Sequence, residues 1–168
     1  MWSILSNFVG QYSMLSMSQF GPIIVIEDDE DDQFLILHCL LELEEKNICH
    51  CFSNGQQAYE YLLKTDEQPF LILCDVNMPV MNGLELRERI ESDPKLKDKA
   101  IPFIFLSTSD SEGLVRKAYN GTIQGFYKKA ESFDELKESI RLIIAYWRRC
   151  LHPNNLIGNP TAKQQNKH

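Results

Sequence analysis

The chain has 168 residues, 43% of them hydrophobic, and a net charge of −7. This length and composition indicate one globular domain with a core of ordinary size. The acidic balance argues against a nucleic-acid-binding surface, and no stretch is long and apolar enough to cross a bilayer. Five cysteines, an odd number with no signal peptide before them, favour a reducing cytoplasm over a disulfide framework.

The N-terminal residues 1–20 carry no charged side chain and mix apolar residues with Ser, Asn and Gln. We expect a flexible extension; the alternative is that translation begins at Met14 or Met17, directly before the first strand. Residues 21–150 form the predicted domain. Residues 151–168, rich in Pro, Asn and Gly, are expected to be a disordered tail.

From residue 22 onward, strand and helix patterns alternate. Short apolar runs predict strands at about residues 22–27, 48–52, 70–75, 101–106 and 124–128. Apolar residues at helical spacing follow each run, so the domain consists of five βα units, a (βα)5 arrangement. Such a chain predicts an α/β fold with a parallel sheet, right-handed crossovers and helices on both faces.

The helix boundaries have their own signals. The acidic run Asp28–Asp32 suits the positive end of a helix dipole. A helix from about Gly83 should end before Pro94, and Ser132 with Glu135 three residues later forms a capping box that starts the last helix.

Polar groups follow four of the predicted strands. They are Glu27 and Asp28 after the first strand, Asp75 after the third, Ser107-Thr108-Ser109 after the fourth, and Lys128-Lys129 at the fifth. Because the carboxyl ends of parallel strands meet at one edge, these groups should surround one crevice. Clustered carboxylates repel one another, and a hard cation such as Mg²⁺ with oxygen ligands relieves that repulsion. An open oxygen of Asp75 could then attack a phosphoryl donor.

Taken together, these motifs resemble the receiver domain of two-component response regulators, over about residues 22–148. The matching segments are Ile23–Asp29, Leu73–Pro79 with Asn82-Gly83, Leu106–Thr108, and Gly125–Lys129. The resemblance implies a flavodoxin-like, doubly wound five-stranded parallel sheet in the order 2-1-3-4-5.

The resemblance also implies a role for each matching residue. Asp75 would be the phosphoacceptor, and the ligands of Mg²⁺ would be the carboxylates of Glu27, Asp28 and Asp75 with the backbone carbonyl of Asn77. Ser107 would turn toward the attached phosphoryl group, and Lys129 would hold one of its oxygens. Phe126 stands where the family has an aromatic residue that changes rotamer on activation; simple core filling is the alternative.

The chain departs from the family pattern in two places. Ala130 follows Lys129 where the family usually has a proline after a cis bond, so we expect either a trans bond with a reshaped loop or a strained cis bond. Ser107 replaces the commoner threonine but keeps the hydroxyl. By strand alternation Lys128 should point away from Lys129, as a solvated edge residue. Residues 29–32 should be mostly a solvated helix start.

The function that follows is that of a stand-alone receiver rather than an enzyme, with at most self-catalysed phosphorylation and dephosphorylation. About 18 residues remain after the last helix, too few for an output domain. The partners would be a sensor histidine kinase or phosphotransfer protein, of the phytochrome-associated or hybrid type, and a downstream protein on the face of strands 4 and 5 and the last helix. A homodimer is a further candidate, and no nucleic acid or membrane is expected.

Two other functions remain open. A degenerate receiver would act as an unphosphorylated scaffold, but the acidic pair, Asp75 and Lys129 are all present. A phosphatase of the haloacid dehalogenase type would use a second aspartate where this chain has Asn77. A separate metal pair at Cys49 and Cys51 is an alternative to simple strand packing, although no second pair of ligands accompanies them.

Overall fold

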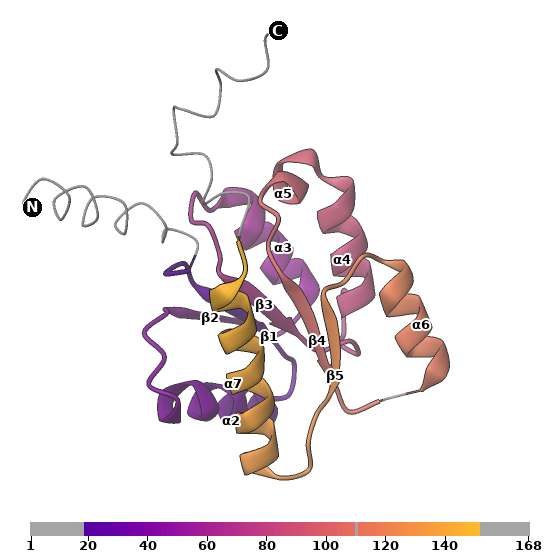
Figure 1. The fold of residues 1–168 in the computed structure, drawn as a ribbon. Helices are drawn as coiled ribbons and strands as arrows, with labels where there is room; N and C mark the ends of the chain where they lie inside the picture. The colour runs from indigo at the N-terminus through magenta and orange to yellow at the C-terminus, as the bar shows by residue number, and fades with distance from the viewer. Residues whose placement is uncertain (1–18, 110, 152–168) are drawn as a thin grey trace, which may run out of the picture.

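The computed structural model describes residues 19–109 and 111–151. They form a five-stranded sheet, parallel throughout, in the order β2-β1-β3-β4-β5 (Figure 1). The strands are β1 (Ile23–Ile26), β2 (Cys49–Phe52), β3 (Leu71–Cys74), β4 (Phe103–Ser107) and β5 (Gly125–Lys128). The predicted α/β class, doubly wound architecture and strand order are confirmed.

The register of the sheet determines which residues meet at its carboxyl edge. Every residue of β1, β3 and β4 is buried, as expected for apolar runs covered on both faces. Ile26 at the end of β1 pairs with Cys74 at the end of β3. The next residues, Glu27 and Asp75, therefore leave the sheet at the same level. On the other side, Ser107 of β4 pairs with Lys128 of β5.

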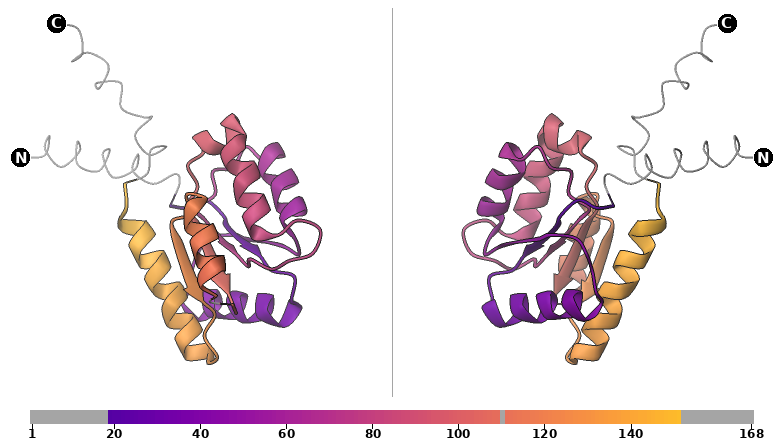
Figure 2. Two further views of the ribbon diagram at one scale, coloured as in Figure 1. Left: turned by 90° about the vertical axis from the view of Figure 1, so that its right-hand side faces the viewer. Right: turned by 90° about the vertical axis from the view of Figure 1, so that its left-hand side faces the viewer.

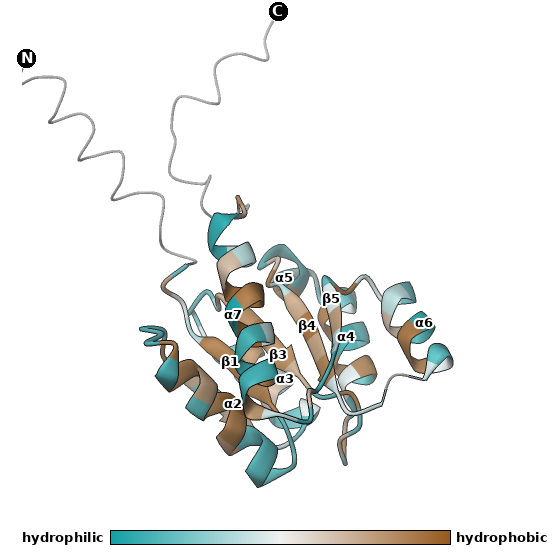
Figure 3. Ribbon diagram, turned by 60° about the horizontal axis from the view of Figure 1, so that its bottom comes forward, coloured by the Kyte–Doolittle hydropathy of each residue, from teal (hydrophilic) through white to brown (hydrophobic). Residues whose placement is uncertain are grey.

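Helices cover both faces of the sheet (Figure 2). They are α2 (Glu30–Glu42), α3 (Gly55–Lys64), α4 (Gly83–Ser92), α5 (Pro94–Asp98), α6 (Glu112–Asn120) and α7 (Phe133–Arg149). The buried residues of α2 and α7 pack in one apolar cluster, and those of α3, α4, α5 and α6 pack in the other. Figure 3 shows apolar colouring along the strands and mixed apolar and hydrophilic colouring on the helices around them.

The connection between α4 and β4 contains a short helix that the sequence analysis did not predict. As the proline implies, α4 ends at Ser92. Asp93 then caps a new turn by accepting a hydrogen bond from the Leu96 amide, and Pro94 occupies its first position, where no amide hydrogen is needed. This turn, α5, buries Leu96 in the core.

Helix α6 is attached to the domain mainly at its C-terminal end. Ala118 is its one buried residue, and Ser111 at its N-terminus makes no side-chain capping bond. Arg87 of α4, only 6% exposed, donates to the carbonyl oxygen of Thr122 at 2.8 Å and to that of Gly121 at 3.4 Å. A cation near the last carbonyls of a helix is favourable, so Arg87 stabilises this end of α6.

Arg87 is itself held firmly. Its guanidinium forms an ion pair with Glu91 and lies over the Phe103 ring, 5.4 Å from the centroid. The link therefore runs from α4, through the buried strand β4, to the turn that leads into β5.

The first residues that the structure describes are hydrogen-bonded to the rest of the domain. Asn47 donates to the carbonyl oxygens of Gln19 and Gly21 at 2.9 and 2.7 Å, and Gln19 donates to the carbonyl oxygen of Arg148 in α7. The expected extension and tail fall almost wholly on residues 1–18 and 152–168, which lie outside the described residues.

No helix within the described ranges combines the length and apolar character needed to cross a bilayer.

Candidate functional site

Asp75 lies directly after β3, where the sheet ends and the β3–α4 loop begins. Its amide donates to the carbonyl oxygen of Ile26 at 2.8 Å, which continues the sheet by one residue. One carboxylate oxygen accepts from the Asn77 amide at 2.9 Å. Asp75 is 7% exposed, and burial raises its pKa because the charged form loses hydration.

Gly83 closes the loop back onto Asp75. Its amide donates to the carbonyl oxygen of Val76 at 2.9 Å. A Cβ atom at this position would lie 2.4 Å from the carbonyl oxygen of Asp75, closer than any side chain can come. Only glycine lets the start of α4 approach the site this closely.

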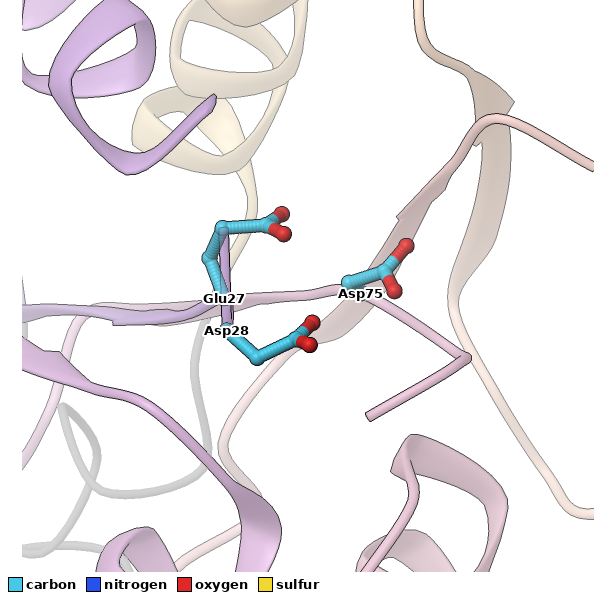
Figure 4. A group of neighbouring side chains, drawn as sticks. All are labelled: Glu27, Asp28 and Asp75. Atoms are coloured by element: carbon cyan, nitrogen blue, oxygen red, sulfur yellow. The ribbon is translucent and has the colours of Figure 1, made fainter. Parts of the chain in front are cut away.

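Three carboxylates converge beside the sheet edge. Oxygen atoms of Glu27, Asp28 and Asp75 all lie within 4.8 Å of one another, and Figure 4 shows the three side chains next to each other, with Glu27 and Asp28 extending toward Asp75. Glu27 is 3% exposed, and burial raises its pKa to about 7, although Lys129 opposes that shift. Oxygen-only donors at this spacing suit a hard divalent cation, so the donor set fits a divalent metal.

Lys129 extends from the end of β5 into the acidic cluster. Its Nζ lies 2.6 Å from Glu27 Oε2, 2.7 Å from Asp32 Oδ2 and 3.7 Å from Asp75 Oδ1. The side chain is 10% exposed. Burial by itself lowers the Lys129 pKa, but the hydrogen bonds to Asp32 and Glu27 outweigh it and the pKa is raised.

Asp32 is the site residue that the sequence analysis missed, because it was counted with the solvated helix start. The Asp29 side chain caps α2 by accepting from the amides of Asp31 and Asp32 at 2.9 and 3.1 Å, and this fixes the first turn. No local pattern marked Asp32 as a site residue, because Asp28 precedes the helix that begins at Glu30 and the two acids share no helical face.

Ser107 ends β4 beside these groups and is fully buried. Its hydroxyl oxygen accepts from the Ser109 amide at 3.2 Å, and its carbonyl oxygen accepts from the Lys129 amide at 2.8 Å. A backbone hydrogen bond therefore connects the residue that carries the hydroxyl to the residue that carries the ammonium group. The structure thus brings Glu27, Asp28, Asp75, Ser107 and Lys129 to one sheet edge.

Comparison with known proteins places this site in a family. The model of the response regulator receiver domain matches residues 23–141. The chain belongs to the receiver domain family of response regulators. This confirms the resemblance found in the sequence.

Several relatives match this receiver over most of their length. The probable methanogenesis regulatory protein FilR2 of Methanothrix harundinacea is 28% identical over 129 residues, 74% of this chain and 82% of that protein. The phosphorylated cyanobacterial phytochrome response regulator RcpA has a TM-score of 0.70 at 28% identity, over 77% of this chain and 94% of that one. The Mn²⁺-bound response regulator Rcp1 has a TM-score of 0.68 at 25% identity, over 79% and 97%.

The remaining residues singled out in the sequence have these positions in the receiver. The Asn77 amide binds Asp75. The half-buried Phe126 ring lies 6.0 Å from the Phe105 ring, centroid to centroid, in the cluster under α3, α4 and α6. Lys128 is exposed at the end of β5. The Lys129–Ala130 bond is trans, since no peptide bond between described residues is cis.

The two thiols of β2 show no sign of a metal site. Cys49 and Cys51 are half-buried against the α2–α7 cluster, and burial raises the pKa of both thiols. Within the part of the chain that the structure describes, the acidic trio is the one group of three or more residues placed to hold a metal. Strand packing therefore accounts for this pair.

Proposed function

We propose that this receiver accepts a phosphoryl group on Asp75, from a histidine kinase or phosphotransfer protein, and signals through phosphorylation-dependent protein contacts. The observation that carries the proposal is the position of the Asp75 carboxylate, between two further carboxylates and a buried lysine. The homologous regulators Rcp1 and the chemotaxis protein CheY1 support it.

The metal part of the proposal is Mg²⁺, held by the carboxylates of Glu27, Asp28 and Asp75 and by the backbone carbonyl of Asn77. Bound Mg²⁺ would supply positive charge to the oxygens of the phosphoryl group. The donor set and the Mn²⁺ in the Rcp1 structure support a divalent cation.

The chemistry of Asp75 follows from its surroundings. A carboxylate oxygen of Asp75 attacks phosphorus, a P–O bond forms, and the P–N bond of a phosphohistidine donor breaks. The leaving imidazole keeps the electron pair and takes up a proton. Lys129 neutralises an oxygen of the transferred group, and the Ser107 hydroxyl turns from the Ser109 amide toward it.

The output surface in this proposal is the face of β4, β5 and α7. Tyr146 and Leu142 on α7 are exposed, and Tyr127 with Trp147 lines a small pocket of about 190 Å³ between β5 and α7. Such a face suits a downstream protein or a second copy of the chain. The proposed location is the cytoplasm, which the five free cysteines favour.

The test is phosphorylation by acetyl phosphate with Mg²⁺, followed by intact-protein mass spectrometry. We expect one added phosphoryl group that is labile in base, present in Asp98→Asn and absent in Asp75→Asn. Asp98 is an exposed aspartate at the end of α5 and serves as the matched control. Absence of label from the unaltered chain, together with no Mg²⁺ binding, would support the scaffold function. Continuous release of phosphate at an enzyme's rate would support the phosphatase.

A further inference from the structure

The lysine of the site donates hydrogen bonds to two acids other than Asp75, with which it makes a longer ion pair. Lys129 Nζ lies within hydrogen-bond distance of Glu27 and Asp32, at 2.6 and 2.7 Å. Its distance to the nearest Asp75 oxygen is 3.7 Å, which is too long for a hydrogen bond. A phosphoryl group on Asp75 would therefore compete for an ammonium group that already has two acidic partners at hydrogen-bond distance.

Asp32 and Glu27 differ in what else they can bind. Glu27 belongs to the acidic trio that can hold a cation, and Asp32 does not. A cation in the trio would engage Glu27 and leave Asp32 as the acid that still holds Lys129. The position of Asp32 is fixed, because its amide is bound by the capping residue Asp29.

We propose that Asp32 is a positioning residue that holds Lys129 by a direct hydrogen bond and so competes with the phosphoryl group for the lysine. This proposal rests on the proposed function of Asp75. The lysine stem is long and flexible, so the ammonium group can exchange one oxygen partner for another without a change in the backbone. Loss of the Asp32 charge removes one competitor and frees the lysine for the phosphoryl group.

Asp31 provides a matched control. It is the neighbouring acid in the same helical turn, it is exposed, and its amide is capped by the same Asp29 carboxylate. Asp31→Asn removes the same charge from the same region, so any difference between it and Asp32→Asn reports the contact with Lys129.

The experiment measures binding of beryllofluoride, a mimic of the phosphoryl group, to the full chain with Mg²⁺ by fluorine NMR. We expect Asp32→Asn to bind roughly threefold to tenfold tighter than the unaltered chain, the effect of one partly exposed charge-assisted contact. Asp31→Asn should stay within about twofold, and Asp32→Glu should restore the original affinity. Equal affinities of Asp32→Asn and Asp31→Asn, or weaker binding by Asp32→Asn, would overturn the proposal.

A second readout separates this proposal from the function on which it rests. The Lys129 ammonium protons should exchange with solvent faster in Asp32→Asn than in Asp31→Asn, with no ligand present. Unchanged exchange would show that Asp32 does not hold the lysine. Faster exchange in a protein that binds Mg²⁺ but no beryllofluoride would instead refute the phosphoacceptor role of Asp75, and with it the competition.

Discussion

The part of this receiver around β1, β3 and α2, the α2 side, is more deeply buried than the part around β5 and α6, the α6 side. On the α2 side, the acids follow the fully buried strands β1 and β3, and α2 has a doubly bonded cap and three buried residues. On the α6 side, β5 is only partly buried, and α6 has one buried residue and no side-chain cap. Segments with few buried contacts open at lower free energy. The acids of the site are therefore held more firmly than α6 and β5.

The largest effect on stability should come from adding one methyl group beside the backbone of Asp75. Gly83→Ala places a Cβ atom 2.4 Å from the Asp75 carbonyl oxygen, which is backbone and cannot move aside. We expect a loss of about 2–4 kcal/mol in the free energy of unfolding. Urea denaturation measures the free energy of unfolding. A loss no larger than that of an ordinary surface substitution would show that the backbone beside Asp75 can shift to accommodate the methyl group.

The next effect should come from cutting the link between α4 and the C-terminal end of α6. Arg87→Met removes the guanidinium that pairs with Glu91 and donates to the carbonyl oxygens of Gly121 and Thr122. We expect a loss of about 2–3 kcal/mol, with faster amide hydrogen exchange concentrated in α6.

The control for this link is Arg89→Met on the same helix. Arg89 is exposed and lies over the Tyr59 ring, so its loss should cost less than about 1 kcal/mol. Equal acceleration of exchange in α2 and α6 of Arg87→Met would mean that the arginine supports the whole domain rather than α6.

A smaller effect is the pH dependence of stability that Glu27 causes in the metal-free protein. The folded-state pKa of Glu27 is raised from 4.5 to about 7, so the folded state holds this proton more tightly than the unfolded state. The resulting stability is present below pH 4.5 and is lost as the pH rises through 7, by at most about 1–2 kcal/mol after allowance for the neighbouring lysine.

Denaturation of metal-free protein at several pH values tests the Glu27 effect. Glu27→Gln should remove the decline between about pH 5 and 7. Glu42→Gln should not, because the pKa of the exposed Glu42 is lowered by Lys137 and its effect falls at lower pH. An unchanged decline in Glu27→Gln would place its origin elsewhere.

The smallest effect on stability should come from the same Gly→Ala change in α6. Gly113 lies in α6, and a Cβ atom there would meet nothing within 4 Å. Gly113→Ala should therefore stabilise the protein by about 0.5–1 kcal/mol, the gain in helix propensity. Chemical denaturation of the two Gly→Ala variants side by side compares the regions directly. Destabilisation by Gly113→Ala would show that α6 has neighbours closer than the structure indicates.

The sequence was sufficient for features set by local patterns. Apolar runs indicated the strands, and the polar residues after four of them indicated the site, because both depend on neighbours in the chain. The contact between Asp32 and Lys129 joins residues 97 apart, and that between Arg87 and Thr122 joins residues 35 apart. An exposed-looking acid and a helical arginine carry no local sign of such partners, so both were missed. The roles of Asp75, Ser107, Asn77 and Phe126 stay predictions.

Helix α6 is held more firmly near its C-terminal end, by Ala118 and Arg87, than in its first turn, where Leu114 is only partly buried against the core. Its nine residues span about 13 Å at 1.5 Å per residue. A tilt of roughly 10° about the end held by Arg87 would move the other end, which follows the Ser107–Ser109 segment, by about 2 Å. A hydroxyl that swings through one rotamer covers a similar distance. A change the size of a single side-chain rotation is therefore large enough to redirect the exposed surface of this helix without breaking any of its internal hydrogen bonds.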